Sequence, residues 1–338
     1  LEYLKKDTDF SPRGKQRIAF LEAAVQKKPW QLVGGIRPIE IRTAPYGRKD
    51  VANKAMTGGR TVAEGFGLQV KFNDRASSLL LLDTGAHGIL IGRGLAEKAG
   101  VVKFADASFG GIGDKGEVEA YWAWADKITI GGLEFHNCTV LVSSKSNVAD
   151  GAGLIGPDIF QDFLVTLDFK QQRVLLSPLP RNPNAPANED DPTDRYIAPE
   201  MQEYTKIYRF GHDLVIPVLV SDKVWGNFIL DTGAGTTSIT PQLAAQITKV
   251  SDQGNYSIRG VSGSVARVQE GDKAILQFGK VRARSDDLPV FDHHISNDET
   301  TEIGGFISIK TLVQMKMTID YRDGLVNFEV YEFQKARE

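Results

Sequence analysis

The sequence predicts a mainly β protein built from two similar lobes in one chain, and two internal repeats support this prediction. An apolar run followed by Asp-Thr-Gly-Ala occurs at Asp83 and again at Asp231, 148 positions later (231 − 83). Downstream, residues 153–169 align without a gap on residues 305–321, at an offset of 152 (305 − 153). A repeat of two long copies indicates a duplicated domain, because a solenoid needs more and shorter units.

Each repeat contains a strand that carries one carboxylate at its end. Residues 79–82 are consecutive leucines before Asp83, and the apolar residues 228–230 precede Asp231. An apolar run this short, bounded by a glycine-containing turn, predicts a strand buried on both faces. An ionised aspartate at the end of such a strand is costly unless it is hydrogen-bonded or shares its charge. The two aspartates are therefore the candidate functional residues.

Composition narrows the class of protein. The 338 residues suffice for two domains, and contents of 41% hydrophobic and 25% charged residues are ordinary for a globular protein. The net charge of −3 provides no basic surface for nucleic acid, and no apolar run approaches the ~18 residues that span a membrane. The single cysteine, Cys138, excludes an internal disulfide, and we expect it in the core.

The chain divides into an N-terminal extension, two lobes and a linker. The extension covers residues 1–61, lobe one residues 62–178, a proline-rich linker residues 179–199, and lobe two residues 200–338. The linker combines its prolines with an acidic run, a composition that cannot build a core and predicts an exposed connection.

The N-terminal extension predicts a helix followed by a strand. Ser11-Pro12 is typical of a helix start, Pro29 ends the apolar periodicity, and residues 34–43 alternate as a strand does. The helix is rich in Lys and Arg. Two interpretations stay open: a helix that packs on a lobe, and a basic segment that covers an acidic site.

Within the lobes, other segments predict a short helix and two mobile hairpins. Residues 95–99 predict the helix. The glycine-rich residues 109–118 in lobe one and residues 258–268 in lobe two each predict a hairpin that could cover a site.

These features resemble the aspartic peptidases over roughly residues 62–330. Each half has a DTG loop and a later segment of two apolar residues and glycine, which is Leu154-Ile155-Gly156 in lobe one and Phe306-Ile307-Ser308, with serine replacing glycine, in lobe two. The two lobes in one chain resemble the pepsin arrangement about a pseudo-two-fold axis. The DTGA sequences and the lack of disulfides are similar to the bacterial and retroviral retropepsin-like branch. Because the chain begins at Leu1 and relatives of this kind are exported, we expect an extracytoplasmic bacterial location.

The resemblance assigns Asp83 and Asp231 jointly as the catalytic pair. Two carboxyl groups held together share one proton, so that one activates a water and the other polarises the amide carbonyl. It implies a supporting role for the rest of both loops, in which the threonines hydrogen-bond across to the opposite loop, the glycines allow close approach, and the alanines keep the site floor open. These residues are Thr84, Gly85, Ala86, Thr232, Gly233 and Ala234. No metal and no cofactor is expected.

The hairpins supply further candidates for substrate contact. In the family a flap covers the site at this point of the chain, which nominates Gly111, Ile112 and Gly113 from lobe one and Gly260 and Val261 from lobe two. The lobe-one tip lacks the tyrosine of pepsin-like flaps. His87 directly follows DTGA, where retropepsins carry aspartate, and either contacts substrate or is a surface turn residue. A metal site at Asp292-His293-His294 with Asp298 and Glu299 is less consistent with the pattern than a solvated loop, because adjacent residues on a strand point to opposite faces.

The predicted function is an endopeptidase that binds an extended peptide or protein substrate between its lobes and acts as a monomer. Two alternatives share the fold. One is a peptide-binding module with little or no activity, which the serine at position 308 leaves open. The other is a zymogen held inactive by the N-terminal segment.

Overall fold

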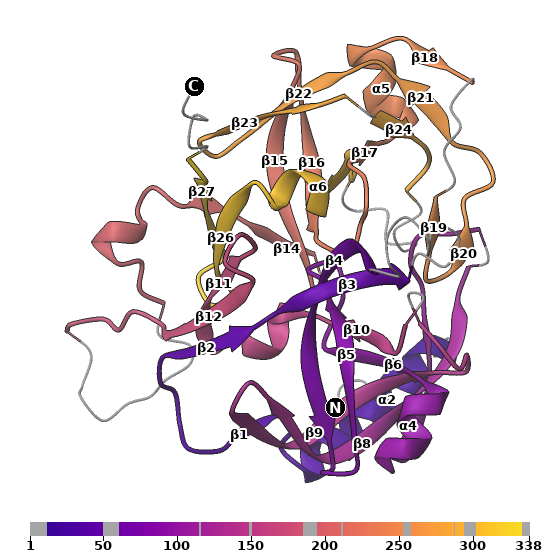
Figure 1. Ribbon diagram of the computed structural model, residues 1–338, viewed down its shortest axis with the longest axis vertical. Coiled ribbons are helices and arrows are strands. Elements are labelled where there is room, and N and C mark those ends of the chain that lie inside the picture. Colours follow the sequence, from indigo (N-terminus) through magenta and orange to yellow (C-terminus); the bar gives the residue numbers. More distant parts are fainter. Residues whose placement is uncertain are drawn as a thin grey trace.

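The fold is mainly β, with two lobes joined by a shared sheet, as the repeats predict (Figure 1). The structure is a computed structural model, and it describes residues 12–49, 61–114, 116–148, 151–184, 195–210, 212–252, 258–286, 288–293 and 302–332. In the described chain, no helix is long and apolar enough to cross a membrane.

Lobe one is built on a nine-stranded sheet. The order across the sheet is β1-β9-β6-β10-β5-β4-β8-β7, and β3 pairs with β4. Its elements are β1 (Gln31–Leu32), β3 (Ala44–Lys49), β4 (Thr61–Phe72), β5 (Ala76–Leu82), β6 (Ile89–Gly92), α4 (Arg93–Ala99), β7 (Val102–Phe109), β8 (Val118–Ile130), β9 (Leu133–Ser143), β10 (Gly153–Ile155) and the 3-10 helix η1 (Pro157–Phe160).

Lobe two repeats this plan with a ten-stranded sheet and a separate hairpin. The order across the sheet is β18-β21-β24-β17-β25-β16-β15-β22-β23, and β14 pairs with β15. Its elements are η2 (Pro199–Met201), β14 (Tyr208–Phe210), β15 (Asp213–Val220), β16 (Val224–Asp231), β17 (Ser238–Ile239), α5 (Pro241–Ile247), β18 (Val250–Ser251), β19 (Arg259–Gly260), β20 (Gly263–Ser264), β21 (Gln269–Gly271), β22 (Ala274–Phe278), β23 (Val281–Ser285), β24 (Leu288–Val290), β25 (Gly305–Ser308) and α6 (Ile309–Leu312).

A six-stranded antiparallel sheet joins the lobes in the order β13-β27-β26-β11-β12-β2. Its strands are β2 (Ile39–Arg42), β11 (Phe163–Asp168), β12 (Arg173–Pro178), β13 (Thr205–Lys206), β26 (Met315–Asp320) and β27 (Leu325–Val330). At its centre Thr166 pairs with Thr318, and their hydroxyl oxygens lie 2.9 Å apart. The two threonines occupy equivalent places in the repeat, 152 positions apart, so the pseudo-two-fold axis passes between them.

Equivalent turns show how the repeated sequence gives the repeated fold. The β4–β5 turn places Asn73 and Asp74 at positive φ, and the β15–β16 turn does the same with Ser221 and Asp222. Two consecutive residues at positive φ match the right-handed twist of a hairpin, and Asn and Asp tolerate this conformation better than most residues. Both hairpins then return as the strands that end at the DTG loops.

The N-terminal extension packs on lobe one. Helix α2 (Pro12–Gln26) lies against β7, where the Phe20 ring is 4.8 Å from Trp122 and 5.9 Å from Phe104 between centroids. The predicted strand is shorter than residues 34–43, since β2 covers only Ile39–Arg42 and pairs with β12. Ser11, the expected helix cap, lies outside the described residues, and the interpretation of the helix as a cover stays a prediction.

One hydrophobic core runs through both lobes and the shared sheet. The strands that precede the DTG loops belong to it, with Leu82 2% and Leu230 0% exposed. Cys138 is buried in the same core as a free thiol, as expected from composition, and burial raises its pKa far above the usual range. The loops therefore project from rigid strands and hold their side chains in fixed positions.

Candidate active site

The two DTG loops meet at the junction of the lobes, each at the end of a buried strand. Strand β5 ends at Leu82, and the backbone N–H of Asp83 donates to the carbonyl of Ile155 at 2.9 Å. Strand β16 ends at Asp231, which is paired with Ser308 of β25. The segments at 154–156 and 306–308 thus lie beside the loops, as the sequence alignment predicts.

The carboxyl groups of Asp83 and Asp231 lie close enough for each to change the pKa of the other. A Cβ placed on Gly85 would lie 2.9 Å from Cγ of Asp231, and one on Gly233 would lie 2.5 Å from Cγ of Asp83. Each carboxyl group therefore sits against the glycine of the opposite loop, in space that a side chain would fill. This is the close approach that the two glycines predict.

Backbone N–H groups hold the carboxylates in place. The N–H of Gly85 donates to Oδ1 of Asp83 at 2.9 Å. The N–H groups of Gly233 and Ala234 both donate to Oδ1 of Asp231 at 2.8 Å. These bonds fix one oxygen of each carboxyl group and leave the other oxygens for the partner aspartate and a reactant.

Burial and proximity raise the pKa of both aspartates. Asp83 is 9% exposed, and its burial, followed by the negative charge of Asp231, raises its pKa well above the usual range. Burial also raises the pKa of Asp231, opposed by the hydrogen bond from Asp83 and by backbone N–H groups. The pair therefore retains a proton at a pH at which two separate aspartates would be ionised.

The threonines of the two loops exchange hydrogen bonds across the axis. The Thr84 N–H donates to Thr232 Oγ1 at 3.0 Å, and the Thr232 N–H donates to Thr84 Oγ1 at 3.0 Å. Each hydroxyl then donates to the opposite strand, Thr84 to the Leu230 carbonyl at 2.6 Å and Thr232 to the Leu82 carbonyl at 2.8 Å. Both side chains are almost fully buried, so four buried hydrogen bonds lock the lobes together.

The serine at position 308 is accommodated by neighbouring hydroxyl groups. Ser308 is fully buried, and its Oγ lies 3.1 Å from Thr237 Oγ1, which also lies 3.1 Å from Thr311 Oγ1. The backbone N–H of Ser308 donates to Thr237 Oγ1 at 3.1 Å. In lobe one a side chain at Gly156 would collide with the Ala86 carbonyl and the Asp158 carboxylate. Lobe two therefore accommodates Ser308 in place of the family's glycine, and its DTG loop stays intact.

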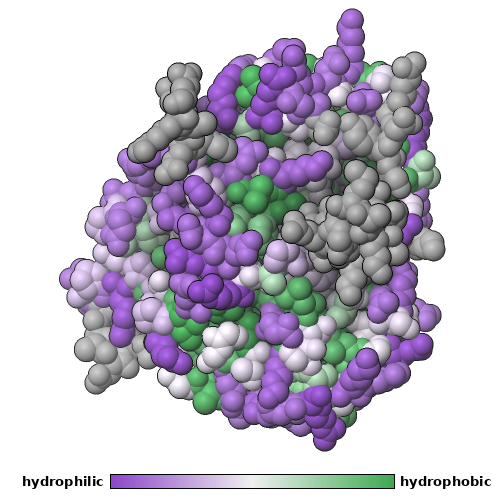
Figure 2. All heavy atoms as spheres, viewed as in Figure 1, coloured by the Kyte–Doolittle hydropathy of each residue, from purple (hydrophilic) through white to green (hydrophobic). Residues whose placement is uncertain are grey.

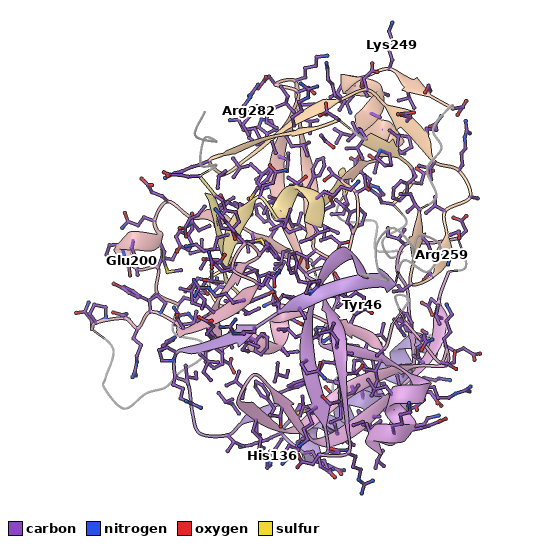
Figure 3. All side chains as sticks on the ribbon, in the orientation of Figure 1. Tyr46, His136, Glu200, Lys249, Arg259 and Arg282 are labelled. Atoms are coloured by element: carbon purple, nitrogen blue, oxygen red, sulfur yellow. The ribbon has the colours of Figure 1, made fainter. Side chains whose placement is uncertain are left out.

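The two predicted hairpins meet each other over the site. The Ser262 N–H donates to the Ile112 carbonyl at 3.2 Å, and the Asp114 N–H donates to the Ser264 carbonyl at 3.1 Å. The Asp114 carboxylate also accepts a hydrogen bond from the Ala266 N–H. Figure 1 shows β19 and β20 at the part of lobe two nearest lobe one, and Figure 3 labels Arg259 on this hairpin.

Each hairpin tip contacts an apolar cluster of the opposite lobe. Val261 packs against a lobe-one cluster that we name cluster one, formed by Leu81, Leu90, Val148 and Leu154. Ile112 packs against a lobe-two cluster that we name cluster two, formed by Val215, Ile229, Ile303 and Phe306. Leu81 and Ile229 both stand two positions before a catalytic candidate, so the clusters flank the aspartates on opposite sides. Figure 2 shows hydrophobic side chains gathered toward the middle of a largely hydrophilic face.

The remaining flap candidates are glycines at the points of closest approach. Gly111 faces the Val261 side chain, Gly113 faces the backbone of residues 262 and 263, and Gly260 faces Ile112. A side chain at any of the three would collide with the opposite hairpin. The structure thus brings Gly111, Gly113 and Gly260 together in one contact.

His87 is exposed but ion-paired beside the site. Its Nδ1 lies 2.6 Å from Asp158 Oδ2, and Asp158 Oδ1 accepts from the Gly88 N–H at 2.9 Å. The carboxylate raises the pKa of His87. His87 therefore anchors the segment that follows the DTG loop of lobe one to η1.

Sequence reasoning did not find His212 and Asp213, which also reach the site. His212 Nε2 lies 3.2 Å from the Gly85 carbonyl oxygen, although 127 positions separate the two residues. The His212 and His87 rings are 5.7 Å apart between centroids. Asp213 is 7% exposed, and burial raises its pKa to about 6, with an additional contribution from the charge of Asp231. The one signal in the sequence is that Asp213 stands where the first copy has Gly65.

The described residues contain no group of three or more side chains that could hold a metal ion. The Nε2 atom of His293 lies 3.1 Å from Ser238 Oγ. The imidazole ring makes edge-to-face contacts with the rings of Phe291 and Phe306. His294, Asp298 and Glu299 lie outside the described residues.

Comparisons with known proteins assign the class. Residues 68–162 match the family model described as "gag-polyprotein putative aspartyl protease", and residues 216–305 match the one described as "Aspartyl protease". The two matches begin 148 positions apart (216 − 68), the offset of the two DTG loops. Among curated proteins, no match is found.

The fold agrees with these matches. The chain is similar to the crystal structure of the aspartic proteinase from Irpex lacteus, with a TM-score of 0.51 and 11% identity over 88% of this chain and 99% of that one. This likeness is one of fold. Together with the two family matches, it shows that the chain is an aspartic peptidase of the retropepsin-like or pepsin-like type, which is a class of hydrolase.

Proposed function

We propose that the protein is an active aspartic endopeptidase in which Asp83 and Asp231 together activate a water molecule. The observation that carries this proposal is the contact between the two carboxyl groups, each seated against the glycine of the opposite loop. A pair in this geometry holds one proton between two carboxyl groups, which is the requirement for acting as acid and base at once.

In the proposed reaction the ionised member takes a proton from water as the water oxygen attacks the amide carbon. The protonated member donates its proton to the carbonyl oxygen, and the resulting diol intermediate collapses with transfer of a proton to the leaving amine. The raised pKa values belong to the pair, which holds one proton between its two carboxyl groups. The three backbone N–H bonds described above hold one oxygen of each carboxyl group in position.

The substrate is proposed to be an extended segment of a peptide or protein. Cluster one and cluster two offer apolar contacts on the two sides of the aspartates, and the hairpin tips complete both. An extended peptide presents side chains alternately to its two sides and its amide groups to neighbouring backbone. Because the hairpins touch each other, they must separate before such a segment enters.

Helix α2 contacts β7 of lobe one, and whether this helix also restrains activity is a separate question with a direct test. Removal of residues 1–28 tests whether the helix restrains activity, and it spares β2 and β3, which pair with the sheets. Increased peptide cleavage would support the restraint, and unchanged cleavage would leave packing as the role of α2. The extracytoplasmic location and the monomeric state stay predictions.

The proposal is tested by incubating the purified protein with a peptide library over a range of about pH 3 to 8 and identifying products by mass spectrometry. We expect cleavage within peptides by the wild-type protein and none by Asp83→Asn or Asp231→Asn. A protein that binds library peptides and cuts none at any pH would instead be a binding module of the same fold.

A further inference from the structure

One side of the aspartate pair carries a cluster of two histidines and two aspartates. On this side His87 and Asp158 come from lobe one, and His212 and Asp213 come from lobe two. The repeat offsets place Gly235 opposite His87, Lys310 opposite Asp158 and Gly65 opposite Asp213. Lys310 is exposed, and the two glycines have no side chain. The two DTG loops are therefore alike, whereas His87 and Asp213 each have a glycine as their counterpart in the other lobe.

The position of Asp213 is next to both the opposite loop and an apolar cluster. A Cβ on its counterpart Gly65 would lie 3.8 Å from the Thr232 carbonyl oxygen and 2.8 Å from Cδ1 of Leu81. The pseudo-symmetry places Asp213 correspondingly beside the loop of Thr84 and beside cluster two. The contact of the adjacent His212 with the Gly85 carbonyl agrees with this placement.

The Asp213 carboxylate lacks a full complement of partners. His212 Nε2 lies 3.4 Å from Asp213 Oδ1, and the described residues donate no hydrogen bond to this carboxyl group. The cations nearby are already engaged, since His87 is paired with Asp158, and the Arg209 guanidinium lies 5.8 Å over the Tyr321 ring. A buried carboxylate with this little compensation is costly, and its pKa of about 6 reflects that cost.

Resting on the proposed function, we propose that Asp213, with His212 beside it, is a specificity-determining residue that binds a basic side chain of the substrate peptide. A lysine or arginine side chain entering between the DTG loop of lobe one and cluster two supplies the hydrogen-bonding cation that the carboxylate lacks. Its aliphatic stem contacts cluster two on the way. Since lobe one has Gly65 at the equivalent place, this selectivity acts on one side of the scissile bond only.

The test measures binding in a background that does not require turnover. The Asp83→Asn protein is titrated with labelled peptide pairs that differ only in lysine against norleucine, at each position near the scissile bond. The measurement is made at about pH 7, above the pKa of Asp213. We expect one position at which lysine binds roughly tenfold or more tightly than norleucine, the size of a hydrogen bond to a charged group.

Three variants assign that preference to Asp213. Adding Asp213→Asn reduces the lysine-to-norleucine ratio to about one, and adding Asp213→Glu, which keeps the charge, retains part of it. The matched control is Asp222→Asn, in the turn that follows the far end of β15, where the aspartate pairs with Arg282 on the surface; this variant keeps the full ratio. Circular dichroism and thermal unfolding verify that all variants are folded.

The proposal is overturned if no position prefers lysine, if no peptide binds at all, or if Asp213→Asn leaves the ratio intact. Cleavage of the same peptides by the wild-type protein is scored separately. A wild-type protein that cuts the norleucine peptides as well as the lysine peptides contradicts this inference and supports the endopeptidase. Preferential binding of the lysine peptides without any cleavage supports this inference and contradicts the proposed endopeptidase activity.

Discussion

Thr84 and Thr232 each donate a backbone N–H to the hydroxyl of the other at 3.0 Å, and each hydroxyl donates to the strand of the opposite lobe. Replacing either threonine with alanine removes two of these bonds and leaves buried backbone groups without a partner. We expect a loss of roughly 2–4 kcal/mol in the free energy of unfolding, measured by denaturant titration.

The threonines also supply their own control. Thr84→Ser keeps the hydroxyl and should recover most of the stability that Thr84→Ala loses. In the double variant Thr84→Ala/Thr232→Ala the losses should be smaller than the sum of the single losses, because the two residues belong to one network. Strictly additive losses would show that the threonines act independently.

Gly233 and Gly235 provide a matched pair two positions apart. A methyl group at Gly233 would lie 2.5 Å from Cγ of Asp83, whereas one at Gly235 would meet no atom within 4 Å. We expect Gly233→Ala to reduce kcat/KM for peptide cleavage by roughly 100-fold, because it displaces a catalytic carboxyl group. Gly235→Ala should keep kcat/KM within about threefold of the wild type. Equal effects at both positions would exclude displacement as the cause.

The pH dependence of cleavage should report the raised pKa values of the pair. Activity requires one proton on the pair, so it falls as pH rises through the pKa of that shared proton, which lies above the usual range of aspartate. The positive charge of His212 lowers the pKa of Asp231. His212→Gln should therefore raise that pKa and move the acidic limb of the pH–rate profile to higher pH. A limb that stays in place would show that His212 is not coupled to the pair.

Asp213 should destabilise the folded protein at neutral pH. Its folded-state pKa of about 6 exceeds the usual value of 3.8, so the folded state binds its proton more tightly than the unfolded state does. Its contribution to stability therefore declines as pH rises from about 4 to about 6 and stays low above that. We expect Asp213→Asn to gain up to about 3 kcal/mol relative to wild type between about pH 3.5 and pH 7. A constant difference across this range would contradict the cause assigned to the shift.

Gly156 and Ser308 occupy equivalent places with different surroundings. Ser308→Gly removes the Oγ that bonds to Thr237 and should cost about 1–2 kcal/mol in unfolding free energy, with kcat/KM little changed. Gly156→Ser should cost more, because its side chain collides with Ala86 and Asp158. Denaturant titration of both variants checks the order. A larger cost for Ser308→Gly than for Gly156→Ser would contradict the conclusion that a side chain fits at this place in lobe two and collides with its neighbours in lobe one.

The sequence predicts the positions of the two DTG loops well because their signal is local and repeated. An apolar run before DTGA is sufficient to place Asp83 and Asp231 at strand ends, and the offset between copies predicts that the loops meet. Glycine-rich segments likewise predict both hairpins, and the structure adds that their tips contact opposite lobes through Ile112 and Val261.

Other features depend on contacts that no local pattern records. The hydroxyl groups around Ser308 come from Thr237, 71 positions away, so the sequence shows only a missing glycine. His212 reaches the Gly85 carbonyl because β15 begins beside the opposite lobe, and no motif surrounds it. The strand over residues 34–43 is shortened because its pairing with β12 begins at Ile39 and ends at Arg42.

The central claim is that Asp83 and Asp231 act as one catalytic unit. The direct measurement is kcat/KM for one cleaved peptide with the wild type, Asp83→Asn, Asp231→Asn and the double variant. We predict that each single substitution reduces kcat/KM by roughly 1,000-fold or more, and that the double variant is no slower than the single variants, because either loss already abolishes the shared function. A single variant that retains a large part of the activity, or a double variant whose losses multiply, would contradict it.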